Sequence, residues 1–395
     1  MMWLARDLVA KVQRVAAQFP VVVLTGARQT GKSTLLRHAF PNHAYVSLDL
    51  MDNAELAERS PAEFLARFPA PLMLDEVQYA PAVFRHLKAA VDQRPEVAGQ
   101  YILTGSQKYS LMKGASESLA GRAAILELET LSDHELLASA HTREASLAER
   151  IVRGGYPALW RDRSIATDTF FSSYVSSYIE RDLRQLLQVS NLRDFDRFVR
   201  ICAIYNGQLL NKANVSRDVG VAQSTITQWL AALQASNLIT LLEPWHGNAK
   251  KRLVKTPKLY FNDTGLVCHL LRVDGAALTQ SPFVGALWET FVFAELRKRL
   301  AAGDARDALY FYRDSQGCEV DFMMHTAQGI RLMECKWTEL PEARDAANML
   351  TVARDFEKAQ SPFRIVSQDV VCRTASAYPL TEVARGVGLS SLVPT

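Results

Sequence analysis

Apolar residues in the first third of the chain gather in short continuous runs rather than in an alternating pattern. The clearest runs are Val21–Thr25, Pro71–Leu74, Gln100–Thr104 and Ala123–Thr130. Segments with helical periodicity separate them, including Thr34–Ala39 and Ser110–Ala120. Strands that are buried on both faces and joined by helices form parallel sheets. The pattern predicts an α/β fold whose first domain, residues 1–140, contains a parallel sheet.

Helical spacing of apolar positions dominates the segments on either side of this core. Met1–Gln18 is predicted to form a packing helix rather than an export signal. Residues 141–194 are predicted to form a helical connector or lid, with a turn or hinge at Gly154–Pro157. Within Ser173–Val189, a predicted long helix, we expect Tyr174, Tyr178 and Leu183 in the core. Arg181 and Arg184 are expected on the solvated surface, with interface cations as the alternative.

Residues 195–270 have the order of elements of a winged helix. The predicted elements are three helices and two strands, namely Phe195–Tyr205, Lys212–Val219, Gln223–Ser236, Leu238–Glu243 and Lys258–Phe261. Gly220 supplies the turn between the second and third helices, because glycine tolerates left-handed backbone. A third helix of this kind enters a groove of DNA.

The same module carries an excess of positive charge. Residues 195–261 contain nine Lys and Arg against three Asp and Glu, whereas the whole chain has a net charge of only +3. This predicts contact with DNA through the start of the third helix and the hairpin tip, at Gln223, Ser224, Thr225, Thr227, Lys250, Lys251 and Arg252. The alternative is a protein-binding module whose charged hairpin tip is merely solvated.

Residues 271–395 predict a second α/β unit. A helix at Gly285–Leu300 precedes strands at Leu309–Arg313, Glu319–Phe322 and Arg331–Lys336. A further helix at Pro341–Lys358 and a strand at Phe363–Ser367 follow. The tail Thr374–Thr395 is predicted to form a small appended helix.

The overall composition is that of a soluble protein of two or three domains. Of the 395 residues, 48% are hydrophobic and 22% charged, and no apolar run reaches membrane-spanning length. The chain is therefore not expected to have a membrane partner. The five cysteines are scattered without C-x-x-C spacing, which favours a reduced cytoplasm and no structural zinc.

A phosphate-binding loop follows the first strand. Residues 26–33 match G-x-x-x-x-G-K-[ST] and read Gly26, Ala27, Arg28, Gln29, Thr30, Gly31, Lys32 and Ser33. The loop amides and the first turn of the next helix, at Thr34, surround phosphates, while Lys32 supplies charge and Ser33 can ligate Mg²⁺. The motif predicts ATP and Mg²⁺ as ligands.

The next two strands end in residues that suit ATP hydrolysis. Asp75 is predicted to hold Mg²⁺ together with Ser33, and Glu76 to orient and deprotonate the attacking water. Either Thr104 or Ser106, at the tip of the neighbouring strand, is expected to sense the γ-phosphate.

Arg122 precedes the last core strand. We expect it to reach the nucleotide of a neighbouring subunit, where a cation stabilises the transferring phosphoryl group. The alternative is a cap at the end of the preceding helix.

These motifs resemble the AAA+ superfamily, and more narrowly the bacterial and archaeal AAA-type ATPases joined to the domain of unknown function 4143. The resemblance covers nearly the whole chain and extends through Arg153–Pro157, Tyr178–Asp182, Asn262–Leu266 and Leu287–Glu289. It implies a five-stranded parallel core and a homo-oligomeric ring, expected to be a hexamer, with nucleotide between subunits.

The C-terminal unit resembles the PD-(D/E)xK nuclease superfamily. Asp321 and the Glu334–Lys336 E-x-K motif lie on successive predicted strands, after the helix that carries Glu289. The resemblance implies that Glu289, Asp321 and Glu334 hold Mg²⁺ or Mn²⁺ beside Lys336. Val320 stands where the superfamily has proline. Cleavage and mere binding of nucleic acid remain open alternatives.

Together these features predict an ATP-driven motor that moves or remodels DNA. A nucleotide-switched regulator or scaffold, in which the later modules bind proteins, is the alternative from another class. A metal-dependent nuclease gated by ATP is the third possibility.

Overall fold

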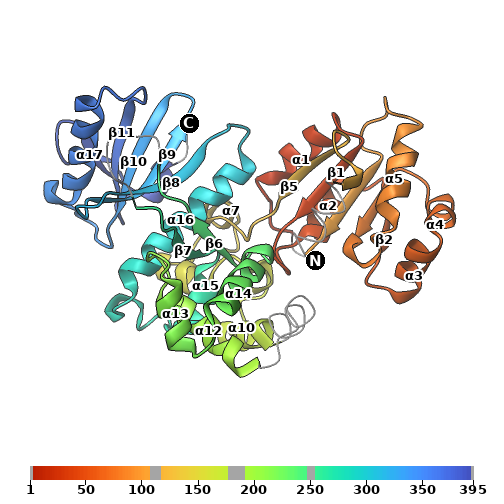
Figure 1. The fold of residues 1–395 in the computed structure, drawn as a ribbon, viewed down its shortest axis with the longest axis horizontal. Coiled ribbons are helices and arrows are strands. Elements are labelled where there is room, and N and C mark those ends of the chain that lie inside the picture. Colours follow the sequence, from red (N-terminus) through yellow and green to blue (C-terminus); the bar gives the residue numbers. More distant parts are fainter. Residues whose placement is uncertain (1–2, 107–116, 177–191, 247–253, 393–395) are drawn as a thin grey trace.

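The computed structural model describes residues 3–106, 117–176, 192–246 and 254–392. Two sheets lie at opposite ends of its long axis, and a helical region lies between and beside them (Figure 1). In the part of the chain described, no helix is both long and apolar enough to cross a membrane.

The N-terminal sheet has five parallel strands in the order β2-β3-β4-β1-β5. Its strands are β1 (Val21–Thr25), β2 (Ala44–Ser47), β3 (Leu72–Asp75), β4 (Tyr101–Gly105) and β5 (Ala123–Glu127). The helices that accompany it are α1 (Leu8–Ala16), α2 (Lys32–Ala39), α3 (Met51–Arg59), α4 (Pro61–Arg67) and α5 (Val83–Asp92). The parallel core is confirmed. Most of the predicted helix Ser110–Ala120 lies outside the described residues.

The N-terminal helix starts later than predicted, at Leu8, and residues 3–6 before it form no regular secondary structure. Leu4 and Arg6 are buried there, and the Arg6 guanidinium donates to the carbonyl oxygens of Thr30 and Glu129. These tertiary contacts hold the segment away from helical geometry.

The middle of the chain is mainly helical and ends in a hairpin. Its helices are α7 (Asp133–Ala138), α8 (Leu147–Arg153), α9 (Pro157–Arg161), α10 (Thr167–Tyr174), α12 (Leu192–Ile204), α13 (Lys212–Val219), α14 (Gln223–Ala235) and α15 (Thr264–Leu271). Strands β6 (Ile239–Leu242) and β7 (Lys258–Phe261) pair in antiparallel fashion before α15. Gly220 ends α13 in left-handed geometry, with φ of 86°. Tyr174 is buried as expected, but Tyr178, Leu183, Arg181 and Arg184 lie outside the described residues.

The C-terminal sheet has six strands in the order β12-β13-β11-β10-β9-β8. Its strands are β8 (Ala308–Arg313), β9 (Glu319–Thr326), β10 (Gly329–Cys335), β11 (Ile365–Val371), β12 (Tyr378–Pro379) and β13 (Ala384–Val387). Helices α16 (Val284–Ala302) and α17 (Ala347–Lys358) accompany it, and β10 runs parallel to β11.

The prediction of an appended helix at the C-terminus is wrong. Residues 384–387 form β13 parallel to β11, and only a short 3-10 turn, Leu389–Leu392, follows. Ala384 and Gly386 are buried while Arg385 is exposed, which is the alternation of a strand with one covered face.

The middle region and the C-terminal unit share one hydrophobic core. This core includes Trp160, Phe198 and Leu230 from the middle region together with Trp288 and Met333 from the C-terminal unit. It spans the predicted boundary at residue 271, so the helices of the middle region pack directly against α16.

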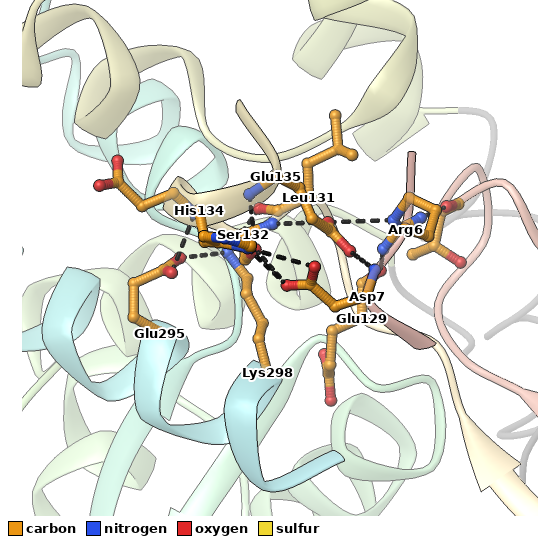
Figure 2. Close-up of polar contacts among 11 residues, drawn as sticks. Arg6, Asp7, Glu129, Leu131, Ser132, His134, Glu135, Glu295 and Lys298 are labelled. Carbon is orange, nitrogen blue, oxygen red and sulfur yellow. Dashed lines mark hydrogen bonds and ion pairs between the residues drawn. The ribbon is translucent and has the colours of Figure 1, made fainter. Parts of the chain in front are cut away.

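A buried polar network joins the N-terminal domain to this shared body (Figure 2). Arg6 pairs with Glu135 of α7, both with side chains about 5% exposed. The backbone amide of Asp133 donates to Glu295 of α16, and Lys298 donates to the carbonyl oxygen of Leu131. The exit from β5 is thus held between the N-terminal segment and α16.

The predicted hinge at Gly154–Pro157 is fixed by Asp263. One oxygen of this buried carboxylate accepts from Gly155 N at 2.8 Å, and the other caps α15 through Gly265 N at 3.0 Å. A Cβ at Gly154 would approach the Asp263 carboxylate within 2.1 Å, so only glycine fits. The carboxylate therefore fastens the hinge to α15.

Replacing Asp263 by Ala should destabilise the protein by about 2 to 4 kcal/mol, because buried amides lose their acceptor and α15 loses its cap. Urea unfolding followed by tryptophan fluorescence measures this loss. Asp274→Ala is the matched control, since Asp274 accepts from Ala277 N at an exposed site; we expect a change within about 0.5 kcal/mol. Equal losses in both variants would contradict the role given to Asp263.

Candidate nucleotide site

The phosphate-binding loop lies between β1 and α2, at the carboxyl edge of the parallel sheet. Gly26 has φ of 145°, and a Cβ there would lie 2.2 Å from the carbonyl oxygen of Leu128. Gly31 has φ of 92° at the N-terminus of α2. These two positions need glycine, and they turn the loop so that its amides precede the helix N-terminus.

Lys32 is buried within its own loop. Its ammonium donates to the carbonyl oxygens of Gly26 and Ala27 at 3.0 and 2.8 Å. Burial lowers the pKa of Lys32 to about 8, against the opposing effect of Glu76 and Asp75. An anionic phosphate group would stabilise this buried charge.

Three hydroxyl groups converge on Asp75 at the end of β3. Ser33 Oγ and Tyr45 Oη donate to Oδ2 at 2.7 and 2.6 Å, and Thr104 Oγ1 donates to Oδ1 at 2.7 Å. Burial, followed by the contact with Asp75, raises the pKa of Tyr45 to about 12. The Ser33 hydroxyl and the Asp75 carboxylate are the hard oxygen donors that Mg²⁺ prefers, so these residues fit the ion. Sequence reasoning missed Tyr45, because only the pairing of β2 with β3 brings it here.

Glu76 has a left-handed backbone, with φ of 55°, which is uncommon for a residue with a Cβ. Its Oε2 accepts from the Ser106 amide at 3.1 Å and from the Ser106 hydroxyl at 2.9 Å. Thr104 thus contacts one acid of the site and Ser106 contacts the other. The choice of γ-phosphate sensor between them stays open.

Arg122 lies at the other end of the sheet from the phosphate-binding loop. It precedes β5 beside Val21, the first residue of β1, whereas the loop follows the last. Its guanidinium pairs with Asp92 of α5, with 2.5 Å between Nε and Oδ1. Its Nη1 also donates to the carbonyl oxygen of Ala120 at 3.1 Å, which fits the alternative of a cap at the end of the preceding helix. A role at the nucleotide of a neighbouring subunit stays a prediction.

A cavity of about 410 Å³ adjoins the loop, and sequence reasoning did not predict it. Trp3, Gly31, Thr34, Pro157 and Arg161 are among the residues that line it. Trp3 stacks on His38 with ring centroids 4.3 Å apart. The cavity thus lies between the N-terminal segment, the start of α2 and the hinge.

The predicted nucleic-acid residues are described only in part. Gln223, Ser224 and Thr227 are exposed in the first turns of α14, and Thr225 is half-buried. The opposite face of α14, including Trp229, is buried. The predicted tip residues Lys250, Lys251 and Arg252 lie outside the described residues.

The three C-terminal acids predicted as metal ligands come together from α16, β9 and β10. Burial and the neighbouring Asp321 raise the pKa of Glu289 to about 7 and that of Glu334 to about 8. Lys336 donates to Glu334 Oε2 at 3.1 Å. A residue that sequence reasoning did not place here, Lys258 of β7, lies among these carboxylates.

The arrangement of these carboxylates differs from that expected of a metal site. Within the described residues, no group of three or more His, Cys, Asp or Glu side chains is arranged to hold a metal ion. Lys258 Nζ lies 3.0 Å from Glu289 Oε1 and 3.7 Å from Asp321 Oδ1. The only sign of this arrangement in the sequence was the presence of Lys258, which was counted among the basic residues of the middle module.

Family comparison agrees with the phosphate-binding loop and the parallel sheet of the N-terminal domain. Residues 18–137 match the family described as "AAA domain", and residues 284–392 match "Domain of unknown function (DUF4143)". Residues 144–277 match a second domain of unknown function, DUF8612.

Solved structures show weaker likeness. A Walker-type ATPase of Pyrococcus abyssi, PABY2304, has 16% identity and a TM-score of 0.46, covering 67% of this chain and 95% of its own. A RuvB protein of Thermotoga maritima has 16% identity and a TM-score of 0.30, covering 59% of this chain and 86% of its own.

Two relatives match along almost the whole chain. They are the uncharacterized proteins Rv2008c of Mycobacterium tuberculosis and Mb2031c of Mycobacterium bovis. Each is 31% identical over 396 residues, which cover 99% of this chain and 85% of the relative. The chain therefore belongs to the same family as these two mycobacterial proteins. It joins an AAA-type ATPase domain to DUF4143.

Proposed function

We propose that this protein binds ATP with Mg²⁺ at the phosphate-binding loop and hydrolyses it. The observation that carries the proposal is the position of the two acids at the end of β3. Asp75 contacts Ser33, the residue that follows the loop lysine, and Glu76 is held by Ser106 of the neighbouring strand tip. A metal-binding pair and a candidate base thus flank one phosphate-binding loop.

In this mechanism Lys32 exchanges its two carbonyl partners for phosphate oxygens. Ser33 and Asp75 would hold Mg²⁺, which would neutralise charge at the phosphates when bound. Glu76 accepts a proton from the attacking water. Its contact with Ser106 keeps the carboxylate oriented at the sheet edge.

We further propose that the cavity beside the loop receives the base of the nucleotide. The cavity adjoins Gly31 and Thr34, which lie at the phosphate end of α2. Trp3 offers an aromatic surface for stacking, and Pro157 also lines the cavity. This would make the N-terminal segment and the hinge parts of the nucleotide site.

The proposed use of hydrolysis is movement or remodelling of DNA by a homo-oligomeric ring, expected to be a hexamer, in the cytoplasm. The order α12-α13-α14-β6-β7 supports a winged helix, and the exposed Gln223, Ser224 and Thr227 support its contact with DNA. Arg122 would complete the nucleotide site of the neighbouring subunit.

A nucleotide-switched regulator or scaffold is the second candidate function. The observation that favours it is Lys258, which lies among the acids that a nuclease would need for metal. A C-terminal unit of this kind binds a partner rather than cutting nucleic acid.

Glu76→Gln should leave ATP binding intact and lower the rate of phosphate release about 10²-fold or more, because the general base is removed. Binding of a fluorescent ATP analogue and steady-state phosphate release measure the two effects. Lys32→Ala should lose binding itself, and Glu63→Gln, at an exposed position of α4, should change neither. Normal turnover by Glu76→Gln would exclude Glu76 as the base.

Trp3→Ala should weaken ATP binding about fivefold to tenfold, because the base loses its stacking partner. Competition with inorganic tripolyphosphate, which has no base, separates this effect from damage to the loop. The affinity for tripolyphosphate should stay at its wild-type value. A parallel loss for both ligands would place the effect of Trp3 on the loop rather than on the base.

DNA should stimulate ATP turnover, and the double change Ser224→Glu with Thr227→Glu should abolish that stimulation by repelling phosphates. Turnover is measured with single-stranded, duplex and branched DNA at fixed salt. Gln234→Glu, exposed near the other end of α14, is the matched control and should retain stimulation. Turnover that no nucleic acid changes would favour the regulator over the motor.

A further inference from the structure

The C-terminal carboxylate cluster contains a cation of its own. Lys258 Nζ lies 2.6 Å from Glu319 Oε1, in addition to its contacts with Glu289 and Asp321. Its side chain is 3% exposed, whereas the carboxylate side chains around it are 14 to 22% exposed. Lys258 is therefore the innermost charged group of the cluster.

The electrostatics favour a charged lysine at this position. Three carboxylates, those of Glu289, Glu319 and Asp321, have an oxygen within 3.7 Å of its Nζ and surround one positive charge. The ammonium also lies 5.6 Å from the centre of the Phe311 ring, in a cation–π arrangement.

Other donors occupy further oxygens that a metal would need. Tyr260, also on β7, donates its hydroxyl to Glu289 Oε1, the same oxygen that Lys258 contacts. The amide of Cys335 donates to Asp321 Oδ2 at 2.8 Å. The one buried oxygen of these acids without a hydrogen-bond partner in the described structure is Glu334 Oε1. Lys258, Tyr260 and the Cys335 amide thus occupy one oxygen of Glu289 and one oxygen of Asp321.

The metal that the PD-(D/E)xK resemblance implies does not fit this donor set. A divalent ion beside Asp321 would face the Lys258 ammonium across the same carboxylate. It would bind only by displacing Lys258 from Glu289, Glu319 and Asp321 together.

We infer that the Lys258 ammonium is the resident cation of this cluster and takes the place that the PD-(D/E)xK resemblance assigns to a divalent metal. Because Lys258 belongs to the β6–β7 hairpin, the cluster joins that hairpin to α16 and β9. The C-terminal unit then carries out no metal-dependent cleavage at this cluster. This inference does not depend on the proposed ATPase activity.

Binding of Mn²⁺ to the full chain without nucleotide tests the inference, with electron paramagnetic resonance reporting the free ion. An Asp75→Asn background removes the negative charge of the carboxylate at the nucleotide site and so weakens Mn²⁺ binding there. In this background the protein should bind no Mn²⁺ at the cluster at millimolar concentration. Adding Lys258→Met should create a site that binds Mn²⁺ at least about tenfold more tightly than the parent.

Further variants assign the new site. Asp321→Asn added to Lys258→Met should remove the gained binding, whereas Glu382→Gln, at an exposed position between β12 and β13, should not. Near-ultraviolet circular dichroism checks folding. If Lys258→Met does not fold, the titration of the parent protein decides the question alone.

Two results would overturn the inference. One is submillimolar Mn²⁺ binding by the parent protein that Asp321→Asn or Glu334→Gln abolishes. The other is a folded Lys258→Met variant that gains no Mn²⁺ binding, because the lysine would then not be occupying a cation position.

Discussion

The buried guanidinium of Arg6 determines how the nucleotide site is attached to the rest of the molecule. It donates to the carbonyl oxygen of Thr30 in the phosphate-binding loop at 2.8 Å, to that of Glu129 after β5 at 2.6 Å, and to Glu135 of α7 at 3.0 Å. A buried charge is stable only when its donors are paired, and here the partners belong to three separate segments. The N-terminal segment, the loop and the connector must therefore assemble together, since each completes the environment that the others need.

From Glu135 the contacts continue to α16. The Glu135 carboxylate also accepts from the Ser132 amide, the next amide along the chain donates to Glu295, and Lys298 contacts both Glu295 and the carbonyl oxygen of Leu131. Figure 2 shows these side chains converging on the turn before α7. The same helix carries Glu289 in its first half, within the carboxylate cluster. The nucleotide site and the C-terminal unit are consequently connected through hydrogen-bonded groups and helix α16, which form a contiguous network of contacts between them.

The local sequence pattern was sufficient to predict the buried parallel strands of the N-terminal sheet and the phosphate-binding loop. The strands around Val21–Thr25 and Leu72–Asp75 and the loop between Gly26 and Ser33 were identified because buried parallel strands and phosphate-binding loops have local signatures. The residues that were missed act through contacts distant in sequence. Tyr45 reaches Asp75 only through strand pairing. Trp3 lines the cavity beside the loop in a segment that Arg6 holds through tertiary contacts. The prediction of a helix in the C-terminal tail was wrong for a related reason. The short strand β13 is stabilised by its pairing with β11 rather than by a local periodicity of its own.

The position of Lys258 in the structure differs from the one that the charge count of the middle module suggests. In the sequence it is one of nine basic residues that make the middle module look like a nucleic-acid surface. In the structure its charge is enclosed by Glu289, Glu319 and Asp321, so it contributes nothing to a phosphate contact. Arg200 pairs with Asp196 on its own helix as well, but both of these side chains remain more than 40% exposed. The case for DNA binding therefore depends on the exposed start of α14 and on the hairpin tip rather than on the charge of the module as a whole. The buried Lys258 cannot add to the positive surface charge that would attract DNA. The same side chain contacts Glu289 and Asp321, two of the acids that metal-dependent cleavage would require. DNA binding and cleavage therefore both depend on where this lysine lies.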